Sequence, residues 1–226
     1  MRPIIFDVRH LKPLLFISLL FSQLCCFAQE DPLPNGFAHN DYRHKRPLYD
    51  ALDNGFTNIE ADIFLKNNKL IVAHVFPYFK GKRTLEKLYL EPLFERVNSN
   101  NDKVYANYNN PVILMIDIKT DADKTYEALK PVLEKYRPIL TSLENGKIVY
   151  RAVTVVLSGH KPYGLIENEK DRLAFIDEDL RRVMPRDSAM NNVYSMASCK
   201  YSKFIRWEGK GMMPHAEKEK LCAFVA

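Results

Sequence analysis

The sequence predicts an α/β fold, a TIM-type (β/α)8 barrel that lacks its C-terminal part. Strand-like and helix-like segments alternate along the 226-residue chain, which is typical of a parallel sheet covered by helices. Apart from a hairpin return strand, six strand candidates lie in residues 29–226, whereas a full barrel has eight strands in ~250 residues. The chain also stops inside an apolar helical segment, so we expect the last strands to be missing. An open doubly wound sheet is the alternative, but no Gly-rich phosphate loop follows the first strand.

The first predicted elements form a strand, a helix and a hairpin. A short apolar run at residues 36–39 ends the first strand, and residues 47–55 read as a helix with Pro near its start and Gly past its end. Residues 57–65 form the second strand. Asn67-Asn68 then predicts a tight turn into a return strand over residues 69–74.

The rest of the chain continues the alternation of strands and helices. Residues 80–109 read as a helical excursion, and PVILMIDIK at residues 111–119 is a continuous apolar run typical of a buried strand. Residues 123–136 have helical spacing, with Pro131 inside predicting a kink or a break. The remaining predicted strands are 152–157, 172–176 and 192–197, and a final helix covers 214–226.

The N-terminal segment predicts export. Residues 1–28 combine a basic start with an apolar stretch from Leu14 to Phe27, the pattern of a secretory signal peptide. The apolar stretch is shorter than the ~20 residues of a spanning helix. We therefore expect residues 29–226 to be a secreted or periplasmic domain without a stable membrane span. Lipid anchoring through Cys25 or Cys26 and an uncleaved membrane anchor are the weaker alternatives.

The charge balance argues against nucleic acid as a partner. The formal net charge is +5, a mild excess that attracts an anionic substrate. No basic run is interleaved with aromatic residues as in a nucleic-acid groove. The sequence gives no indication of the oligomeric state.

Ionisable residues stand at the ends of predicted buried strands, where a barrel places its active site. Glu60 and Asp62 lie two residues apart on the second strand, so the strand period puts both on one face. Asp117 and Lys119 have the same spacing at the end of the third strand. A charge inside such an apolar run is costly to bury unless it is paired or bound to a metal.

These residue types suit metal-assisted hydrolysis of a phosphodiester. Glu60, Asp62 and Asp117 make an oxygen-rich site that fits Mg²⁺ or Ca²⁺ better than zinc. His39 and His74 can act as a general acid and a general base near neutral pH, although their spacing does not say which is which. The alternative for Asp117 is a salt bridge with Lys119.

Two further residues are candidates for substrate binding. Lys119 offers a fixed positive charge to a phosphoryl oxygen. Asn40 offers a polar contact to the phosphate or the metal. Asn40 also has a plainer interpretation as a residue that shapes a turn or caps the next helix.

The stretches AHNDY, PLYDALDNGFTNIEADIFLKNNKLIVAH and ILMIDIK carry a family resemblance. They resemble the glycerophosphodiester phosphodiesterase and phosphatidylinositol phospholipase C-like superfamily, most closely the branch named for altered inheritance of mitochondria. The resemblance implies a TIM barrel and a metal-dependent phosphodiesterase. Residue by residue, it implies the acid/base pair His39 and His74, the metal ligands Glu60, Asp62 and Asp117, and the substrate contact Lys119.

The chain departs from the wider family's pattern at several positions. Asn40 replaces an arginine, Val75 replaces the aspartate after the second histidine, and Asp117 stands where glutamate is usual. Two alternatives therefore stay open. One is a catalytically silent barrel that binds phosphate-bearing ligands, and the other is a phospholipase C-like lyase that needs no metal.

Overall fold

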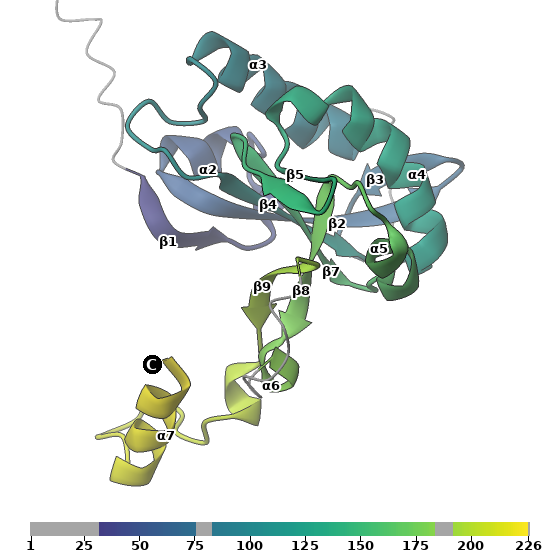
Figure 1. Cartoon of the computed structure of the whole chain (residues 1–226). Helices are drawn as coiled ribbons and strands as arrows, with labels where there is room; N and C mark the ends of the chain where they lie inside the picture. The colour runs from purple at the N-terminus through teal and green to yellow at the C-terminus, as the bar shows by residue number, and fades with distance from the viewer. Residues whose placement is uncertain (1–31, 76–82, 184–191, 226) are drawn as a thin grey trace, which may run out of the picture. The chain divides into compact units, whose positions relative to one another are not determined.

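A computed structural model of the chain describes residues 32–75, 83–183 and 192–225. The predicted signal peptide at residues 1–28 lies outside these ranges. The described part contains one large sheet with six parallel strands (Figure 1). In their order across the sheet these are β1 (Leu33–Ala38), β2 (Phe56–Lys66), β4 (Val112–Ile118), β7 (Val153–Gly159), β8 (Ala174–Asp179) and β9 (Tyr194–Ser198).

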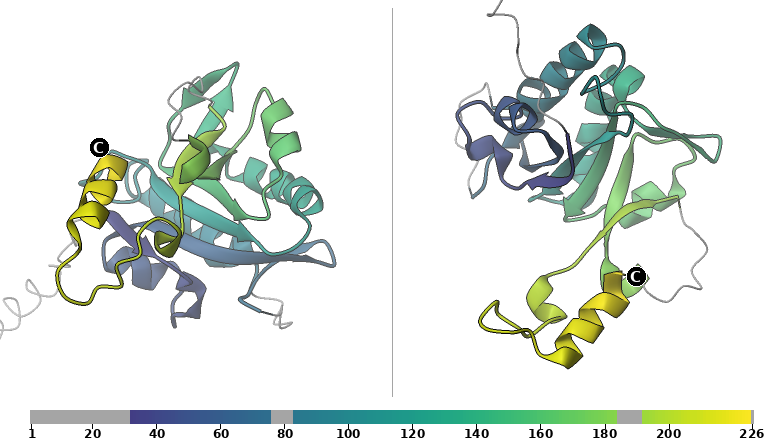
Figure 2. Two further views of the ribbon diagram at one scale, coloured as in Figure 1. Left: turned by 90° about the horizontal axis from the view of Figure 1, so that it is seen from below. Right: turned by 90° about the vertical axis from the view of Figure 1, so that its left-hand side faces the viewer.

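The order of the strands in space follows their order along the chain. Each new parallel strand is added at the same edge, whereas the order in a doubly wound sheet reverses at a switch point. The result is a curled half-barrel consistent with part of a TIM-like barrel. The predicted α/β class and parallel sheet are confirmed, and the eight-stranded barrel remains a prediction. Two further views (Figure 2) show β8 and β9 side by side at one edge of the sheet.

The predicted hairpin after β2 is present. Asn67 and Asn68 both have positive φ, 48° and 57°, which is the geometry of a two-residue turn whose twist matches its strands. The turn leads into β3 (Lys69–Val72), which pairs antiparallel with the end of β2. Because β3 ends at Val72, two residues before the predicted end, His74 lies in the bend that follows.

The helices are mostly short. They are α2 (Tyr49–Asp53), α3 (Glu91–Ser99), α4 (Ala122–Lys135), α5 (Tyr163–Asn168), α6 (Leu180–Val183) and α7 (His215–Val225). A π-helical turn, η3 (Glu86–Leu90), runs into α3, and single 3-10 turns form η2 (Asp41–Arg43), η4 (Arg137–Ile139) and η5 (Tyr201–Lys203). Among the described residues, none of these helices is long and apolar enough to cross a membrane.

Two expectations for the middle of the chain need correction. Helix α4 continues through Pro131, so a break there is wrong; the fully buried Leu129 and Leu133 flank the proline, and their packing offsets its missing hydrogen bond. An antiparallel hairpin, β5 (Ser142–Glu144) and β6 (Lys147–Val149), was not predicted. Its turn is Asn145-Gly146, both with positive φ, and an Asn-Gly pair is a hairpin signal that the sequence offered.

The core lies between the helices and one face of the sheet. Side chains at odd positions of β2 such as Ala61 and Ile63 are fully buried in the same apolar cluster as Leu129 and Leu133 of α4. Helices α3 and α4 lie side by side (Figure 1), where the rings of Phe94 and Tyr136 meet edge to face at 5.7 Å. The opposite face of the sheet, which we call the inner face, therefore carries Glu60, Asp62 and Asp117.

Candidate metal centre and active site

Three carboxylates meet on the inner face near the carboxyl ends of β2 and β4. Asp62 is the direct register partner of Asp117, and Glu60 lies two residues earlier on the same face of β2. One carboxylate oxygen of each residue lies within 4.8 Å of the others. Parallel pairing of β2 and β4 thus brings the predicted metal ligands into one cluster, which we call the acidic triad.

The three negative charges of the acidic triad are unfavourable together. Burial, which is the largest cause, together with the neighbouring Asp62 and Asp117 raises the pKa of Glu60 to about 7, although the backbone N–H of Asn40 acts to lower it. Burial also acts to raise the pKa of Asp62, but hydrogen bonds from Tyr42, His74 and Lys119 outweigh it and lower the pKa. Sites that concentrate buried carboxylates in this way are usually functional, and a cation relieves their repulsion.

Asp117 gives the most direct sign that the triad fits a metal ion. Its Oδ1 is buried and has no hydrogen-bond partner among the described residues. A buried carboxylate oxygen without a partner costs free energy, and a divalent cation on the inner face would satisfy it. With three carboxylates as donors, the site fits a hard cation such as Mg²⁺ or Ca²⁺.

Gly159, the last residue of β7, leaves the space that the Asp117 side chain occupies. A Cβ at this position would lie 2.0 Å from Asp117 Oδ1 and 2.6 Å from the carbonyl oxygen of Ile118. Its φ of +69° is also one that glycine adopts without strain. The close approach of β7 to β4 at the site therefore requires glycine.

Lys119 extends the triad with a positive charge. Its Nζ lies 2.9 Å from Asp117 Oδ2 and 3.1 Å from Asp62 Oδ1. Burial alone would lower the pKa of Lys119, but the hydrogen bonds to the two aspartates raise it, so the ammonium is retained. The salt bridge that we considered as the alternative for Asp117 is present, and it leaves Asp117 Oδ1 open.

His74 joins the site through Asp62. Its Nδ1 lies 3.0 Å from Asp62 Oδ2 and 3.0 Å from the hydroxyl oxygen of Tyr42. The side chain is 44% exposed, so Nε2 is accessible to a substrate. The aspartate holds the ring, as carboxylates commonly do for catalytic histidines.

His39 and Asn40 lie at the end of β1. The backbone N–H of Asn40 donates to Glu60 Oε2 at 2.6 Å, and its side-chain Nδ2 lies 3.0 Å from His39 Nδ1. Asn40 has a φ of 55°, a left-handed conformation that asparagine tolerates well. The structure thus shows Asn40 shaping the turn and orienting both Glu60 and His39, and its contact with substrate stays a prediction.

Two further residues of the HNDY stretch support the site: Tyr42, to which sequence reasoning gave no role, and Asp41, which it considered as a residue that shapes a turn. The hydroxyl of Tyr42 donates to Asp62 Oδ2 at 2.7 Å and also contacts Asn40 Oδ1 and His74, so it links β1, β2 and the bend after β3. Asp41 is fully buried and accepts hydrogen bonds from the Leu48 backbone N–H at 2.6 Å and from the Tyr89 hydroxyl. Asp41 therefore shapes the loop that carries Tyr42, and burial raises its pKa.

Replacing Tyr42 by phenylalanine tests its role as a positioning residue. We expect phosphodiester hydrolysis to fall roughly 10- to 100-fold, because loss of a hydrogen-bonding partner behind a metal ligand typically has this effect. The affinity for Mg²⁺, measured by calorimetry, should fall with it. Tyr49→Phe, at an exposed tyrosine on α2, is the matched control. Unchanged activity in Tyr42→Phe would show that the hydroxyl does not position the metal ligand and that Tyr42 contributes only the packing of its ring.

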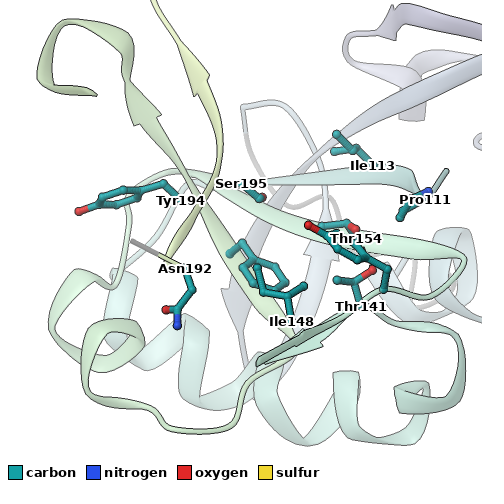
Figure 3. A pocket seen from close by; sticks show the side chains of 10 residues that line it. Pro111, Ile113, Thr141, Ile148, Thr154, Asn192, Tyr194 and Ser195 are labelled. Atoms are coloured by element: carbon teal, nitrogen blue, oxygen red, sulfur yellow. Dashed lines mark hydrogen bonds between the residues drawn. The ribbon is translucent and has the colours of Figure 1, made fainter. Parts of the chain in front are cut away.

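A separate hollow of about 430 Å³ lies at the opposite ends of the strands (Figure 3). Ile113, Thr154 and Phe175 line it, and each stands at the second position of its strand. Barrel active sites lie at the carboxyl ends of the strands, as the acidic triad does. This hollow is therefore not the catalytic site.

Comparison with protein families gives one match that covers most of the described sheet. The model of the AIM6-like phosphodiesterase domain matches residues 30–177, which include the acidic triad and both candidate histidines. No solved structure matches the chain.

Curated proteins that are similar to the chain share one name, altered inheritance of mitochondria protein 6. The chain is 32% identical to the altered inheritance of mitochondria protein 6 homolog of Arthroderma benhamiae over 64% of the chain and 52% of the relative. It is 31% identical to altered inheritance of mitochondria protein 6 of Eremothecium gossypii over 78% of the chain and 51% of the relative. For the protein of that name in Saccharomyces cerevisiae strain YJM789, the identity is 30% over 71% and 48%. The chain thus spans about half the length of the curated relatives it matches.

Proposed function

The chain belongs to the AIM6-like phosphodiesterase family, and we propose that it is an exported, metal-dependent phosphoric diester hydrolase. The proposed substrate is a small-molecule or lipid-derived phosphodiester, such as a glycerol-linked one. A single observation carries the proposal: the acidic triad leaves the buried Asp117 Oδ1 without a partner among the described residues, beside His74 at the carboxyl end of the sheet.

The acidic triad would hold one Mg²⁺ or Ca²⁺, and a bound divalent ion supplies Lewis-acid stabilisation of the negative charge on a phosphoryl group. Lys119 adds a fixed positive charge beside that group. Asn40 keeps Glu60 in position through its backbone N–H. These residues bind and orient the phosphate.

The hydrogen bonds of the two histidines support different roles for them. His74 presents Nδ1 to the carboxylate of Asp62, so Nδ1 carries the proton and Nε2 is free to accept one. The Nδ1 of His39 lies 3.0 Å from the Asn40 side-chain nitrogen, which leaves Nε2 of His39 to face a substrate. We assign His74 as the general base, which removes the proton of an attacking hydroxyl as the new P–O bond forms. We assign His39 as the general acid, which in its imidazolium form gives the Nε2 proton to the alcohol oxygen as the old P–O bond breaks.

Hydrolysis of bis(p-nitrophenyl) phosphate by the full chain tests this proposal. We expect turnover with added Mg²⁺ or Ca²⁺, loss of turnover with EDTA, and recovery when excess metal is restored, because the triad requires a cation to bind the phosphate. His74→Ala should remain inactive at every metal concentration.

The other outcomes identify the alternatives. Turnover that EDTA leaves unchanged would favour the metal-free lyase, in which the ion pairs of Lys119 with Asp62 and Asp117 take the place of a metal. No turnover with any metal, from protein that unfolds cooperatively, would favour the silent barrel.

A further inference from the structure

A further carboxylate on the inner face, beyond the three of the acidic triad, has no role in the site described above. Asp177 lies in β8 and is 5% exposed, yet its Oδ1 has no hydrogen-bond partner among the described residues. Its other oxygen, Oδ2, accepts a hydrogen bond from Ser198 Oγ at 2.5 Å. A buried acceptor that is left open is unusual and costs free energy unless a ligand or water meets it.

The sheet register places Asp177 in the same tier as the acidic triad. Asp117 of β4 pairs with Ser158 of β7. Leu157 pairs with Ile176 of β8, so Ser158 and Asp177 are the next positions along their strands. Side chains alternate between faces, so Asp117, Ser158 and Asp177 all point to the inner face. Two strand spacings separate Asp177 from Asp117, ~10 Å between their backbones, which is within reach of a phosphate ester bound at the triad.

The chemistry around Asp177 favours a hydroxyl as its ligand. A carboxylate oxygen is an acceptor, so it repels the phosphate itself and binds a donor group beside it. An ammonium group is the other donor to consider, but Lys161 is close enough to lower the pKa of Asp177 against the larger effect of burial, and its charge disfavours a second cation. Ser158 and Ser198 flank the carboxylate, whereas sites for quaternary ammonium groups typically use aromatic rings.

We propose that Asp177, with Ser158, forms a subsite that binds a hydroxyl group of the alcohol esterified to the phosphate. The subsite selects hydroxylated diesters over diesters of plain alkyl or aryl alcohols. This inference rests on the proposed function for its location, but Asp177 makes no contact with the acidic triad and takes no part in the proton transfers. It is a specificity residue, and its loss should change the choice of substrate more than the rate of the chemical step.

The test compares two aryl diesters that differ in hydroxyl groups. The full chain and the Asp177→Ala variant are assayed with p-nitrophenyl glyceryl phosphate and with bis(p-nitrophenyl) phosphate. We expect kcat/KM for the glyceryl diester to fall roughly 10-fold or more in the variant, because a hydrogen bond to a charged acceptor is lost, while the value for the aryl diester changes less than about 3-fold. Asp177→Asn keeps an acceptor oxygen, so its kcat/KM for the glyceryl diester should fall less than that of Asp177→Ala.

Glu178→Gln is the matched control. Glu178 is as buried as Asp177 but belongs to the opposite face of β8, where it accepts a hydrogen bond from Tyr163 of α5. Glu178→Gln should leave the ratio of kcat/KM for the glyceryl diester to kcat/KM for the aryl diester unchanged. An equal loss for both substrates in Asp177→Ala, or no loss for either, would overturn the subsite.

A binding measurement separates failure of the subsite from failure of the proposed hydrolase. Calorimetry with Mg²⁺ present compares glycerol 3-phosphate with propyl phosphate, which lacks the hydroxyls, and needs no turnover. We expect the glycerol ester to bind more tightly to the full chain and the difference to disappear in Asp177→Ala. Equal affinities in the full chain, or tighter binding of phosphocholine than of glycerol 3-phosphate, would overturn the inference even if the chain is an active hydrolase.

Discussion

Replacing Asp62 by asparagine should abolish most phosphodiesterase activity without unfolding the protein. Asp62 accepts hydrogen bonds from Tyr42 and His74 on one oxygen and contacts Lys119 with the other. Asparagine removes the charge of a metal ligand and leaves a single acceptor oxygen, so either His74 or Lys119 then faces an NH2 group instead of an oxygen. We expect kcat/KM for bis(p-nitrophenyl) phosphate to fall about 10³-fold, or ~4 kcal/mol of transition-state stabilisation.

The same substitution should leave the folded state intact. Removing the Asp62 charge relieves its repulsion with Glu60, but it also weakens the favourable contacts with Tyr42, His74 and Lys119 that lower the pKa of Asp62. Because these two effects oppose each other, we expect the free energy of unfolding, measured with urea, to fall by no more than ~1 kcal/mol. Loss of activity with retained stability is the mark of a functional cluster.

Asp123→Asn provides the control for charge alone. Asp123 is exposed in the first turn of α4 and lies outside the acidic triad, so this variant should keep full activity. Mg²⁺ binding should weaken in Asp62→Asn and not in Asp123→Asn. If Asp62→Asn retained more than a tenth of the activity, the triad would not be the metal site.

Much of the site could be predicted from the sequence because strand periodicity is a local property. Glu60 and Asp62 share a face wherever residues 57–65 form a strand, and the apolar run around Asp117 marks a neighbouring buried strand. Parallel pairing then brings the carboxyl ends of both strands together. The structure adds the register, which sets Asp62 directly beside Asp117.

Tyr42 and Asp177 could not be found in this way, for two different reasons. Tyr42 reaches Asp62 because a 3-10 turn, anchored by the buried Asp41, folds back over the end of β2, and no periodic pattern encodes such a turn. Asp177 was missed because the predicted strand ended at Ile176, whereas β8 extends to Asp179. Strand ends are set by pairing with β9, a contact between segments that sequence spacing does not reveal.

A catalytically silent barrel that only binds phosphate would need a different balance of charge at the site. A barrel that only bound phosphate would need cations on its inner face, and three clustered carboxylates would weaken such binding unless a metal ion covered them. The structure has one lysine among three acids there. The balance of charge at the site therefore favours a metal-bound enzyme, and it makes the exact position of each carboxylate important.

Replacing Gly159 by alanine should displace the carboxylate of Asp117, although it adds only one methyl group to the site. The new Cβ would overlap Asp117 Oδ1 and the Ile118 carbonyl oxygen, and the latter belongs to the backbone of β4 and has little freedom to move. The positive φ adds strain for any residue with a Cβ. We expect the free energy of unfolding to fall by ~1–3 kcal/mol.

Activity should fall further than stability in Gly159→Ala. Asp117 must move away from β7 to make room, and a ligand displaced by as little as ~1 Å can cost about 10²-fold in rate. Metal affinity and kcat/KM should therefore both drop about 100-fold at a temperature where the variant is fully folded. Gly146→Ala, at another positive-φ glycine with open space around it, is the matched control. It bears the same backbone strain in the β5–β6 turn but touches no ligand, so it should lose stability and keep its activity. Equal activity in the two variants would mean that Gly159 serves only the backbone and that Asp117 tolerates displacement, which a metal ligand does not.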